Sequence, residues 1–288
     1  MTKLLVTGAA GHLGRLVIEA LLERGQSVIA TTRDPAKLVD LAKRGVEVRR
    51  ADFDARASLD EAFAGADRVL LISTDTVDSP GRRVVQHRTA VDALVAAGVK
   101  HVVYTSMPNA DKSLCLIAPD HAATEAALAA TELDYTILRN SMYTEMLLMS
   151  LPGAVASGKL VDAKANAGMT YVTRADCARA AAGALIGASG RTIQDVTGPQ
   201  AITGEGLAAL TSEVAGRPVA YVSVSHAQVV AGLVQHGLPQ PMAEVYASFD
   251  LAAAAGDMAK VTSAVTELGG KPATTVRSFL ESHRAALG

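Results

Sequence analysis

The sequence predicts an α/β protein built on a doubly wound parallel sheet, followed by a smaller, mainly helical C-terminal lobe. Three observations support this prediction. Short apolar runs alternate with segments of helical periodicity through the first half of the chain. A glycine-rich turn separates the first run from the first helical segment. Beyond Arg139 the alternation stops, and helical patterns predominate.

Six short runs are rich in apolar residues and too brief for helices, so we expect buried parallel strands there. They cover residues 3–7, 26–32, 46–50, 68–73, 100–106 and 134–138. Between them lie segments with apolar residues at helical spacing, at 16–22, 37–42, 58–65, 82–97 and 121–130. Asp34 and Pro35 are expected to begin the second helix, and Ser58 with Glu61 forms a capping-box pattern for the third.

The turn after the first predicted strand has the spacing Gly8-x-x-Gly11-x-x-Gly14 and leads directly into a predicted helix. In this context glycines permit a tight turn, bring backbone N–H groups close to a pyrophosphate and let the helix pack on the strand. His12 and Leu13 are expected to contribute through their backbones. The alternative is a packing turn in an α/β protein that binds no nucleotide.

In the C-terminal half, strand and helix patterns no longer alternate regularly. This half offers a short apolar segment at 143–149, an alanine-rich helix opened by 173–176, and a strand at 192–196. From Thr203 onward the patterns are mostly helical, with one strand at 218–222. We therefore expect a Rossmann-type NAD(P)-binding domain over residues 1–150. A mixed α/β lobe on the substrate side, residues 151–288, packs against it as one structural unit.

Composition excludes several classes of protein. A hydrophobic content of 49% with 19% charged residues is typical of a globular enzyme and not of a disordered chain. The net charge of −2 gives no reason to expect nucleic acid or an anionic membrane as partner. No apolar run approaches the roughly 20 residues of a membrane span, and the N-terminus lacks signal-peptide features. Two cysteines, Cys115 and Cys177, favour a reducing, cytoplasmic location, and no metal-ligand spacing is visible.

Arg33 ends the second predicted strand, 19 residues past Gly14. NAD-specific proteins place an acidic residue there for the ribose hydroxyls, whereas an arginine can pair with the 2′-phosphate of NADP. Lys37, one turn into the next helix, adds a second positive charge. Asp34 lies beside them, and the alternative is a solvated surface pair.

Polar side chains also lie where predicted strands end, at the edge of the sheet that borders the cleft. Ser73 and Thr74 end the fourth strand and Ser106 ends the fifth, so their hydroxyls are candidates for the cofactor path. Asp52 and Phe53 follow the third strand. Ordinary strand-end polar residues, and for Phe53 a packed loop aromatic, are the alternatives.

With these elements placed, the sequence resembles the atypical short-chain dehydrogenase/reductases of the NmrA-like group. The resemblance runs from Met1 to about Asp176. It rests on Thr7-Gly8-Ala9-Ala10-Gly11-His12-Leu13-Gly14, Arg33-Asp34-Pro35-Ala36-Lys37, Leu70-Leu71-Ile72-Ser73, Tyr104-Thr105-Ser106, His121-Ala122-Ala123-Thr124-Glu125 and Tyr135-Thr136-Ile137-Leu138-Arg139-Asn140-Ser141-Met142-Tyr143. The resemblance implies an NADP(H)-binding protein, with Phe53 beside the adenine and with Arg139 and Asn140 near the nicotinamide or substrate. We expect Tyr143 to form a wall of the acceptor pocket.

A familiar catalytic motif is missing. Many short-chain dehydrogenases use Tyr-x-x-x-Lys, in which the lysine lowers the tyrosine pKa so that the phenol can protonate an alkoxide. None of the six tyrosines of this chain has a lysine four residues later. At the corresponding helix start stands His121-x-x-x-Glu125, an i, i+4 pair that either orients the imidazole as a weak acid or is only structural.

Three functions remain open from the sequence. The first is an NADPH-dependent oxidoreductase that transfers hydride to a quinone or a similar conjugated aromatic acceptor. The second is a non-enzymatic NADP(H) sensor, since NmrA-like relatives include regulators. The third is a tailoring oxidoreductase of aromatic natural-product biosynthesis. The sequence leaves open whether the chain forms a homodimer.

Overall fold

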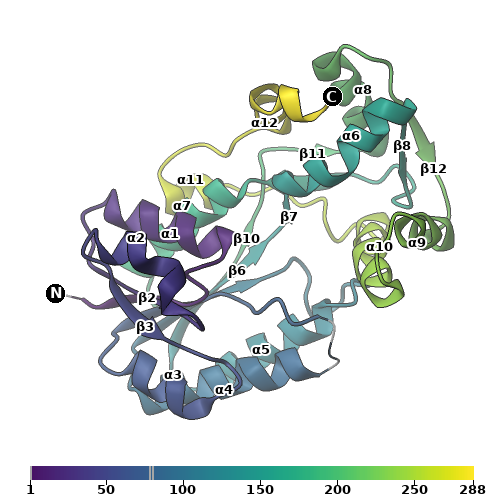
Figure 1. The fold of residues 1–288 in the computed structure, drawn as a ribbon. Coiled ribbons are helices and arrows are strands. Elements are labelled where there is room, and N and C mark those ends of the chain that lie inside the picture. The colour runs from purple at the N-terminus through teal and green to yellow at the C-terminus, as the bar shows by residue number, and fades with distance from the viewer. Residues whose placement is uncertain (1, 78, 80) are drawn as a thin grey trace.

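The centre of the molecule is a seven-stranded sheet in which all neighbouring strands run parallel (Figure 1). The computed structural model describes residues 2–77, 79 and 81–288. The strand order across the sheet is β10-β6-β5-β4-β1-β2-β3. The strands are β1 (Leu4–Val6), β2 (Val28–Thr32), β3 (Glu47–Arg50), β4 (Arg68–Leu71), β5 (His101–Ser106), β6 (Asp134–Asn140) and β10 (Arg191–Val196). The predicted doubly wound parallel sheet is confirmed.

Helices cover both faces of this sheet (Figure 1). On one face lie α1 (His12–Leu22), η1 (Pro35–Leu38), α2 (Val39–Ala42), α7 (Arg174–Gly187) and α11 (Ala264–Gly269). On the other lie α3 (Arg56–Phe63), α4 (Arg82–Ala96) and α5 (Ala118–Ala129). Successive strand residues point to opposite faces, so Leu4 and Val6 pack in the first layer and Leu5 in the second.

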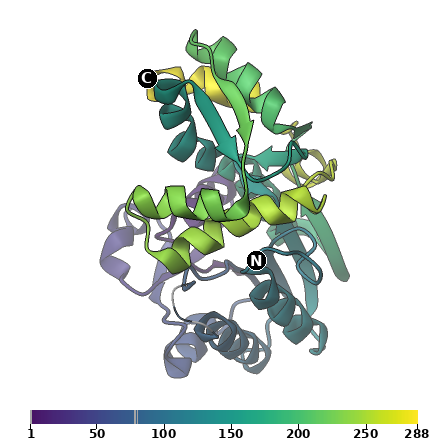
Figure 2. The same ribbon diagram turned by 90° about the vertical axis from the view of Figure 1, so that its right-hand side faces the viewer.

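The remaining elements form a lobe above the carboxyl edge of the sheet (Figure 2). Its helices are η2 (Thr144–Met146), α6 (Leu147–Ser157), α8 (Gly204–Ala215), α9 (His226–Gln235), α10 (Gln240–Ala254), α12 (Val276–Ser282) and η3 (Arg284–Ala286). Its strands are β7 (Met142–Tyr143), β8 (Lys159–Asp162), β9 (Met169–Val172), β11 (Ala201–Ile202) and β12 (Ala220–Ser223). They pair as β11-β9-β7 and as β12-β8. Across the described ranges, no helix combines the length and the apolar character needed to span a bilayer.

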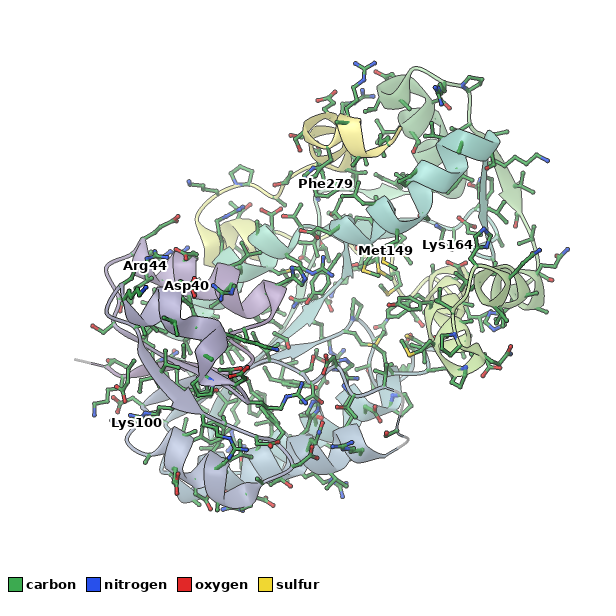
Figure 3. All side chains as sticks on the ribbon, viewed as in Figure 1. Asp40, Arg44, Lys100, Met149, Lys164 and Phe279 are labelled. Carbon is green, nitrogen blue, oxygen red and sulfur yellow. The ribbon has the colours of Figure 1, made fainter. Side chains whose placement is uncertain are left out.

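A buried ion pair lies at the end of β8, next to a contact with α10. The Lys164 Nζ lies 2.7 Å from an Asp162 carboxylate oxygen, and both side chains are more than nine-tenths buried (Figure 3). The next backbone N–H along the chain, that of Ala163, donates to Asp250 of α10 at 2.9 Å. These bonds hold α10 on β8.

The chain enters this lobe after β6 and then returns to the main sheet. Helix α7 packs on the same face as α1, and β10 adds a seventh strand beside β6. Arg68 of β4 anchors the returning helix, because its guanidinium donates to carbonyls of the last turn, those of Ala184, Leu185 and Ala188. The division of the chain at residue 150 stays a prediction. In the structure, residues 174–196 pack with the layers of the main sheet.

Several local predictions are confirmed and others are wrong. Asp34 caps η1 by accepting the Ala36 N–H at 3.1 Å, as the sequence indicates. Ser58 does not cap α3, because that helix begins at Arg56 and the Ser58 hydroxyl instead accepts the Asp52 N–H at 2.7 Å. Helix α5 begins three residues before the predicted start, at Ala118. The segment at 143–149 contains a short strand, a 3₁₀ turn and the beginning of α6.

The contact between α1 and the turn after β1 sets the geometry of the carboxyl edge. Gly8 has a φ of +61°, a left-handed conformation that favours glycine. A Cβ on Gly14 would lie 2.4 Å from the Gly8 carbonyl oxygen and 2.9 Å from the Ala9 Cα. Only a residue without a side chain allows α1 to approach the turn this closely.

Replacing Gly14 by alanine therefore is expected to destabilise the fold. Because backbone atoms, and not a flexible side chain, occupy the space, the Gly14→Ala variant should lose about 3 kcal/mol of unfolding free energy. Gly232→Ala is the matched control, since that helical glycine of α9 has open space at its Cβ position. The control should gain about 0.5–1 kcal/mol. Urea denaturation measures both, and equal stability of Gly14→Ala and the parent would contradict the packing argument.

Candidate functional site

The candidate site begins at the glycine turn, between the carboxyl ends of β1 and β4. Gly11 is the N-cap residue of α1, and its own N–H donates to the Gly8 carbonyl at 2.9 Å. Within the described residues, no side chain caps this helix, and its first turn carries no acidic residue. The first N–H groups of a helix have no intrahelical acceptor, so those of His12, Leu13 and Gly14 are available to an anion.

A positively charged corner lies at the end of β2. Arg33 and Lys37 are both exposed, and among the described residues neither side chain has a hydrogen-bond or ion-pair partner. The nearby acids have partners of their own: Asp34 accepts the Ala36 N–H, Asp40 pairs with Arg15 at 2.7 Å, and Asp54, on which the Arg33 charge also acts, pairs with Arg82 at 2.6 Å. The corner therefore can receive an external anion without breaking an ion pair.

Asp40 and Arg44 lie on the outer surface of this corner (Figure 3). Arg44 binds Glu19 of α1 at 2.5 Å, and Arg15 of α1 also donates to the Lys37 carbonyl. These bonds join η1 and α2 to α1, so the corner and the glycine turn form one rigid edge.

Asp52 and Phe53 follow β3 in a tight turn. The Asp52 carboxylate accepts the Asp54 N–H at 3.1 Å and lies 3.6 Å from Arg50. Phe53 is half-buried and packs against the second apolar layer. This position of Phe53 is compatible both with a contact to adenine and with a side chain packed in the loop.

Ser73 and Thr74 follow β4 and lie beside the glycine turn. Ile72, immediately before them, donates its N–H to the Thr7 hydroxyl at 2.9 Å. The Ser73 N–H donates to the Thr105 hydroxyl at 2.9 Å, and the Thr74 N–H donates to His87 at 3.0 Å. Both side chains are half-buried, and both hydroxyls contact the protein: the Thr74 hydroxyl lies 3.3 Å from His87 Nε2, and the Ser73 hydroxyl accepts from Thr105 at 3.4 Å.

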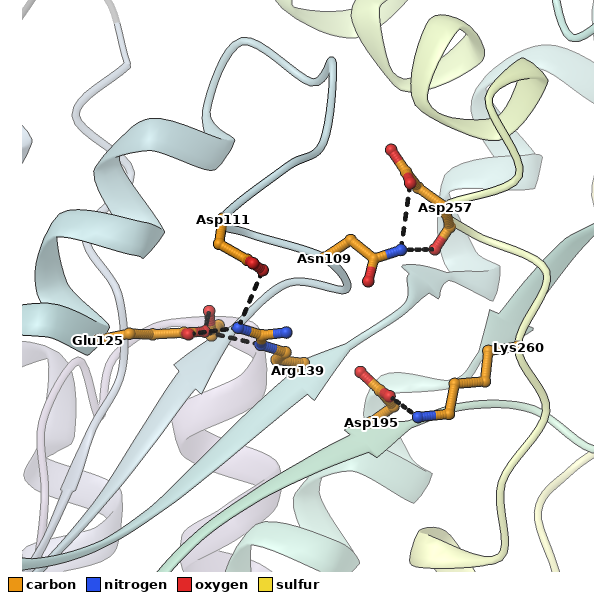
Figure 4. Close-up of polar contacts among 8 residues, drawn as sticks. Asn109, Asp111, Glu125, Arg139, Asp195, Asp257 and Lys260 are labelled. Carbon is orange, nitrogen blue, oxygen red and sulfur yellow. Dashed lines mark hydrogen bonds and ion pairs between the residues drawn. The ribbon is translucent and has the colours of Figure 1, made fainter. Parts of the chain in front are cut away.

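An ion-pair network closes the ends of β5 and β6 (Figure 4). The Ser106 hydroxyl donates to Glu125 at 2.6 Å, and the Arg139 guanidinium binds both oxygens of the same carboxylate at 3.0 and 2.6 Å. Asp111 lies 3.5 Å from Arg139 Nη2, the same nitrogen that binds Glu125 at 2.6 Å. The Ser106 hydroxyl and the Arg139 charge, both expected near the cofactor, are therefore engaged within the protein.

The expected His121–Glu125 pair does not form. Glu125 is bound to Arg139 and Ser106, whereas His121 faces the opposite way. The His121 Nε2 lies 3.0 Å from Arg83 Nη2, and its Nδ1 lies 2.9 Å from the Tyr104 hydroxyl. Because arginine can only donate, Nε2 must accept and the proton of the neutral ring resides on Nδ1.

His121 is buried, with 4% of its surface exposed. Burial lowers its pKa well below the ordinary value, and the charge of Arg83 acts in the same direction. The ring is therefore a neutral member of a buried network between α4, α5 and β5.

Asn140 and Tyr143 lie on the other face of the sheet end, next to α7. The Asn140 amide donates to the Tyr143 hydroxyl at 3.4 Å, and its carbonyl oxygen is buried without a partner among the described residues. Burial raises the pKa of the Tyr143 phenol, as does the nearby Cys177. An unsatisfied buried acceptor at this edge suits a ligand that carries an N–H or O–H donor.

Arg174, which the sequence did not single out, stacks on Tyr143 with its guanidinium carbon 4.6 Å from the ring centroid. Glu145 accepts the Arg174 backbone N–H at 2.9 Å and thereby joins η2 to the start of α7. No local pattern marks Arg174 as a partner of Tyr143, because the two residues come from different elements and meet only in the fold.

A separate groove of about 520 Å³ lies between the β5–α5 connection and the pair α9–α10. Its lining is mainly apolar and includes Leu114, Leu116, Val230 and Leu251. Asn140 and Tyr143 are not among its lining residues. Within the described part of the chain, no group of three or more histidine, cysteine or acidic side chains is arranged to hold a metal ion.

Comparison with known proteins gives a family and several full-length relatives. A model of the NmrA-like family matches residues 1–280. Quinone oxidoreductase 2 of Escherichia coli is 38% identical over 275 residues, which cover 94% of this chain and 95% of that protein. The NAD(P)H azoreductase of Xenophilus azovorans is 29% identical and covers 99% of both chains.

Solved structures agree with these relatives. The NADPH-dependent quinone oxidoreductase of Escherichia coli in complex with NADPH superposes with a TM-score of 0.92 at 37% identity, covering 97% of this chain and 99% of that chain. The triphenylmethane reductase of Citrobacter sp. in complex with NADP(H) gives a TM-score of 0.91 at 35% identity, covering 98% and 99%.

The buried histidines predict a loss of stability in mild acid. Burial lowers the pKa of His87 to about 3 and that of His101 to about 4, and His121 shifts the same way. The unfolded chain therefore takes up protons first as the pH falls below about 6.5. The free energy of unfolding should fall between about pH 6.5 and pH 5 by about 1.4 kcal/mol per pH unit for each histidine.

Urea denaturation across this pH range measures the slope. His101→Gln is the informative variant, because it removes one titrating ring at the end of the sheet opposite the candidate site. It should reduce the slope by about 1.4 kcal/mol per pH unit, and a slope equal to that of the parent would contradict the assignment of His101 as a neutral ring.

Proposed function

Because the chain belongs to the NmrA-like family, we propose that it is an NADPH-dependent oxidoreductase that transfers hydride to a quinone or a similar conjugated aromatic acceptor. The observation that carries the proposal is the uncapped start of α1 over the glycine turn, flanked by the exposed charges of Arg33 and Lys37. The names of the relatives, a quinone oxidoreductase, an azoreductase and a dye reductase, support the acceptor class.

The residues present fit NADP(H). The N–H groups at the start of α1 suit the pyrophosphate, and a side chain at Gly11 would come within 3.2 Å of the Gly8 carbonyl, a tight contact that favours glycine here. Arg33 and Lys37 suit the 2′-phosphate. Asp52, Phe53, Ser73 and Thr74 would border the adenosine and ribose path. The buried Asn140 oxygen would accept from a donor at the nicotinamide end.

Cofactor preference tests the charged corner. Because Arg33 makes no hydrogen bond or ion pair with any described residue, NADPH should bind at least about tenfold more tightly than NADH, about 1.4 kcal/mol. Arg33→Ala should remove most of this preference. Arg44→Ala is the matched control: this exposed arginine of the same surface is already paired with Glu19, and its loss should leave the preference unchanged. Fluorescence titration of the three proteins with both cofactors measures six affinities, and equal binding of NADPH and NADH by the parent would disprove the role of Arg33.

The absence of Tyr-x-x-x-Lys favours a quinone over a simple ketone. When bound, NADPH supplies the hydride. Reduction of a ketone produces a basic alkoxide that needs a nearby proton donor. Reduction of a quinone produces a delocalised phenolate-like anion, which water can protonate later. In this chain His121 is buried and neutral, and Arg139 is paired with Glu125, so neither is a ready donor at the edge of the sheet.

The role of the protein is then to hold the cofactor and the acceptor in position. Asn140 and Tyr143 would shape the acceptor slot, with Arg174 fixing the Tyr143 ring from one side. Positioning two reactants face to face supplies a large part of the rate without acid catalysis. Arg139 would orient the strand ends through Glu125 and Ser106. A cytoplasmic location stays a prediction.

Steady-state kinetics on acceptor panels tests this reaction. We expect NADPH oxidation with quinones and little turnover of unactivated ketones. His121→Ala should lower kcat/KM by less than about a hundredfold, since general acids usually contribute a hundred- to ten-thousandfold. A ketone preferred over every quinone, or near-complete loss in His121→Ala with the fold intact, would mean that a proton donor is present. Tight NADPH binding without turnover of any acceptor would instead favour the sensor function.

A further inference from the structure

Helix α4 carries polar side chains on its buried face. Arg83 and His87, one turn apart, are only 3% and 0% exposed, whereas Val85 between them is 63% exposed. This inverts the ordinary arrangement, in which a helix buries its apolar residues and exposes its charges. Burying a cation and an imidazole costs stability unless they make specific bonds, so their partners indicate what the arrangement serves.

Both side chains bind the main chain of one residue, Thr74. The Thr74 N–H donates to His87 Nε2 at 3.0 Å, and the Thr74 carbonyl accepts from Arg83 Nε at 2.9 Å. The backbone of this loop residue is thus fixed at its donor and at its acceptor, as a strand residue would be by its neighbours.

The opposite atoms of these side chains are also held. The His87 Nδ1 lies 2.8 Å from the Thr124 hydroxyl, which in turn donates to the Asp120 carbonyl at 2.8 Å. Since Nε2 accepts from Thr74, the proton of the neutral His87 ring is on Nδ1 and points to Thr124. Arg83 donates from Nη2 to the buried His121, whereas its Nη1 lies 3.8 Å from Asp120 and makes no hydrogen bond within the described residues.

Thr74 lies where the candidate cofactor path passes. Two residues before it, Ile72 contacts the glycine turn: its N–H is bonded to Thr7, and its Cβ is 3.7 Å from the position of a Cβ on Gly8. A shift of the segment 72–74 would therefore change the wall that faces the start of α1.

We propose that His87 and Arg83 are positioning residues which, backed by His121, hold Thr74 in the place that NADPH binding requires. This rests on the proposed function for the position of the cofactor. His87 and Arg83 affect cofactor binding only through the position of Thr74, and they do not contact the reactants themselves. The inference also gives His121, the helix-start histidine of the sequence motif, a role behind Arg83 instead of in proton transfer.

A comparison of two buried histidines tests the proposal. His87→Leu removes the acceptor of the Thr74 N–H. His101→Leu is the matched control, because His101 is 1% exposed and hydrogen-bonded to Thr136 at 3.0 Å, but lies at the opposite end of the sheet. His87→Gln keeps a carbonyl acceptor of similar reach and serves as the conservative variant.

We expect His87→Leu to raise the Kd of NADPH about tenfold or more, while kcat at saturating NADPH changes less than about threefold. His87→Gln should recover most of the affinity. His101→Leu should be destabilised in urea to a similar extent but keep the parent's Kd. Fluorescence titration, kinetics with a quinone and urea denaturation give the three readouts.

The outcomes separate the two proposals. Parent-like NADPH affinity in folded His87→Leu, or an equal loss of affinity in His101→Leu, would overturn the role of His87 and leave the proposed function standing. A parent protein that binds no NADPH would overturn the proposed function and this inference together. If His87→Leu does not fold, His87→Gln decides: parent-like affinity supports the acceptor role, and an affinity as low as that of an Arg83→Met variant overturns it.

Discussion

The approach of α1 to the turn after β1 is the constraint on which the site depends. Gly14 lies so close to the Gly8 carbonyl that a methyl group has no space, and this contact points the start of the helix across the ends of the central strands. A helix start without a side-chain cap leaves several N–H groups unsatisfied, which costs stability unless water or an anion binds them. The sequence supplies neither a capping hydroxyl nor an acid here, although Asp34, Thr173, Thr203, Ser225 and Thr275 cap other helices. Other helices, among them α3, α4 and α5, also lack a side-chain cap, so what distinguishes the start of α1 is its place above the glycine turn.

Much of the fold follows from periodicity, because the strands and helices of the main layers have strong and local signals. The short strands of the lobe do not: β7 and β11 have two residues each and exist only through pairing with β9. Helix α6 could not be predicted, because it is apolar on most sides and so shows no clear helical periodicity, and because it contains Pro152. The glycine turn could be predicted, because it depends on residues that are close in sequence.

The interior polar partners could not be predicted, since they join elements far apart in the chain. Local helix geometry pairs His121 with Glu125, but Arg139 of β6 brings a full charge and two hydrogen bonds to Glu125. A carboxylate bound at both oxygens by a guanidinium has a stronger partner than a neutral imidazole offers. Likewise, the sequence from Arg82 to Val85 does not show that the Arg83 side chain faces the interior. Hydrophobicity alone predicts that Val85 is buried and Arg83 exposed, the reverse of what the structure shows. The fold overrides that preference through the bonds to Thr74.

The two ends of the candidate cofactor path therefore differ in their electrostatics. At the β2 end, Arg33 and Lys37 are exposed and unpaired among the described residues, so they attract an anion at little desolvation cost. At the β5–β6 end, the Arg139 charge is balanced by Glu125 and Asp111, and His121 is neutral and turned away. Charge that develops on an acceptor at this second end meets no free cation and no ready acid among these groups. The acceptor itself must then carry the charge, which a quinone or an extended aromatic system does by delocalisation and an isolated carbonyl does not.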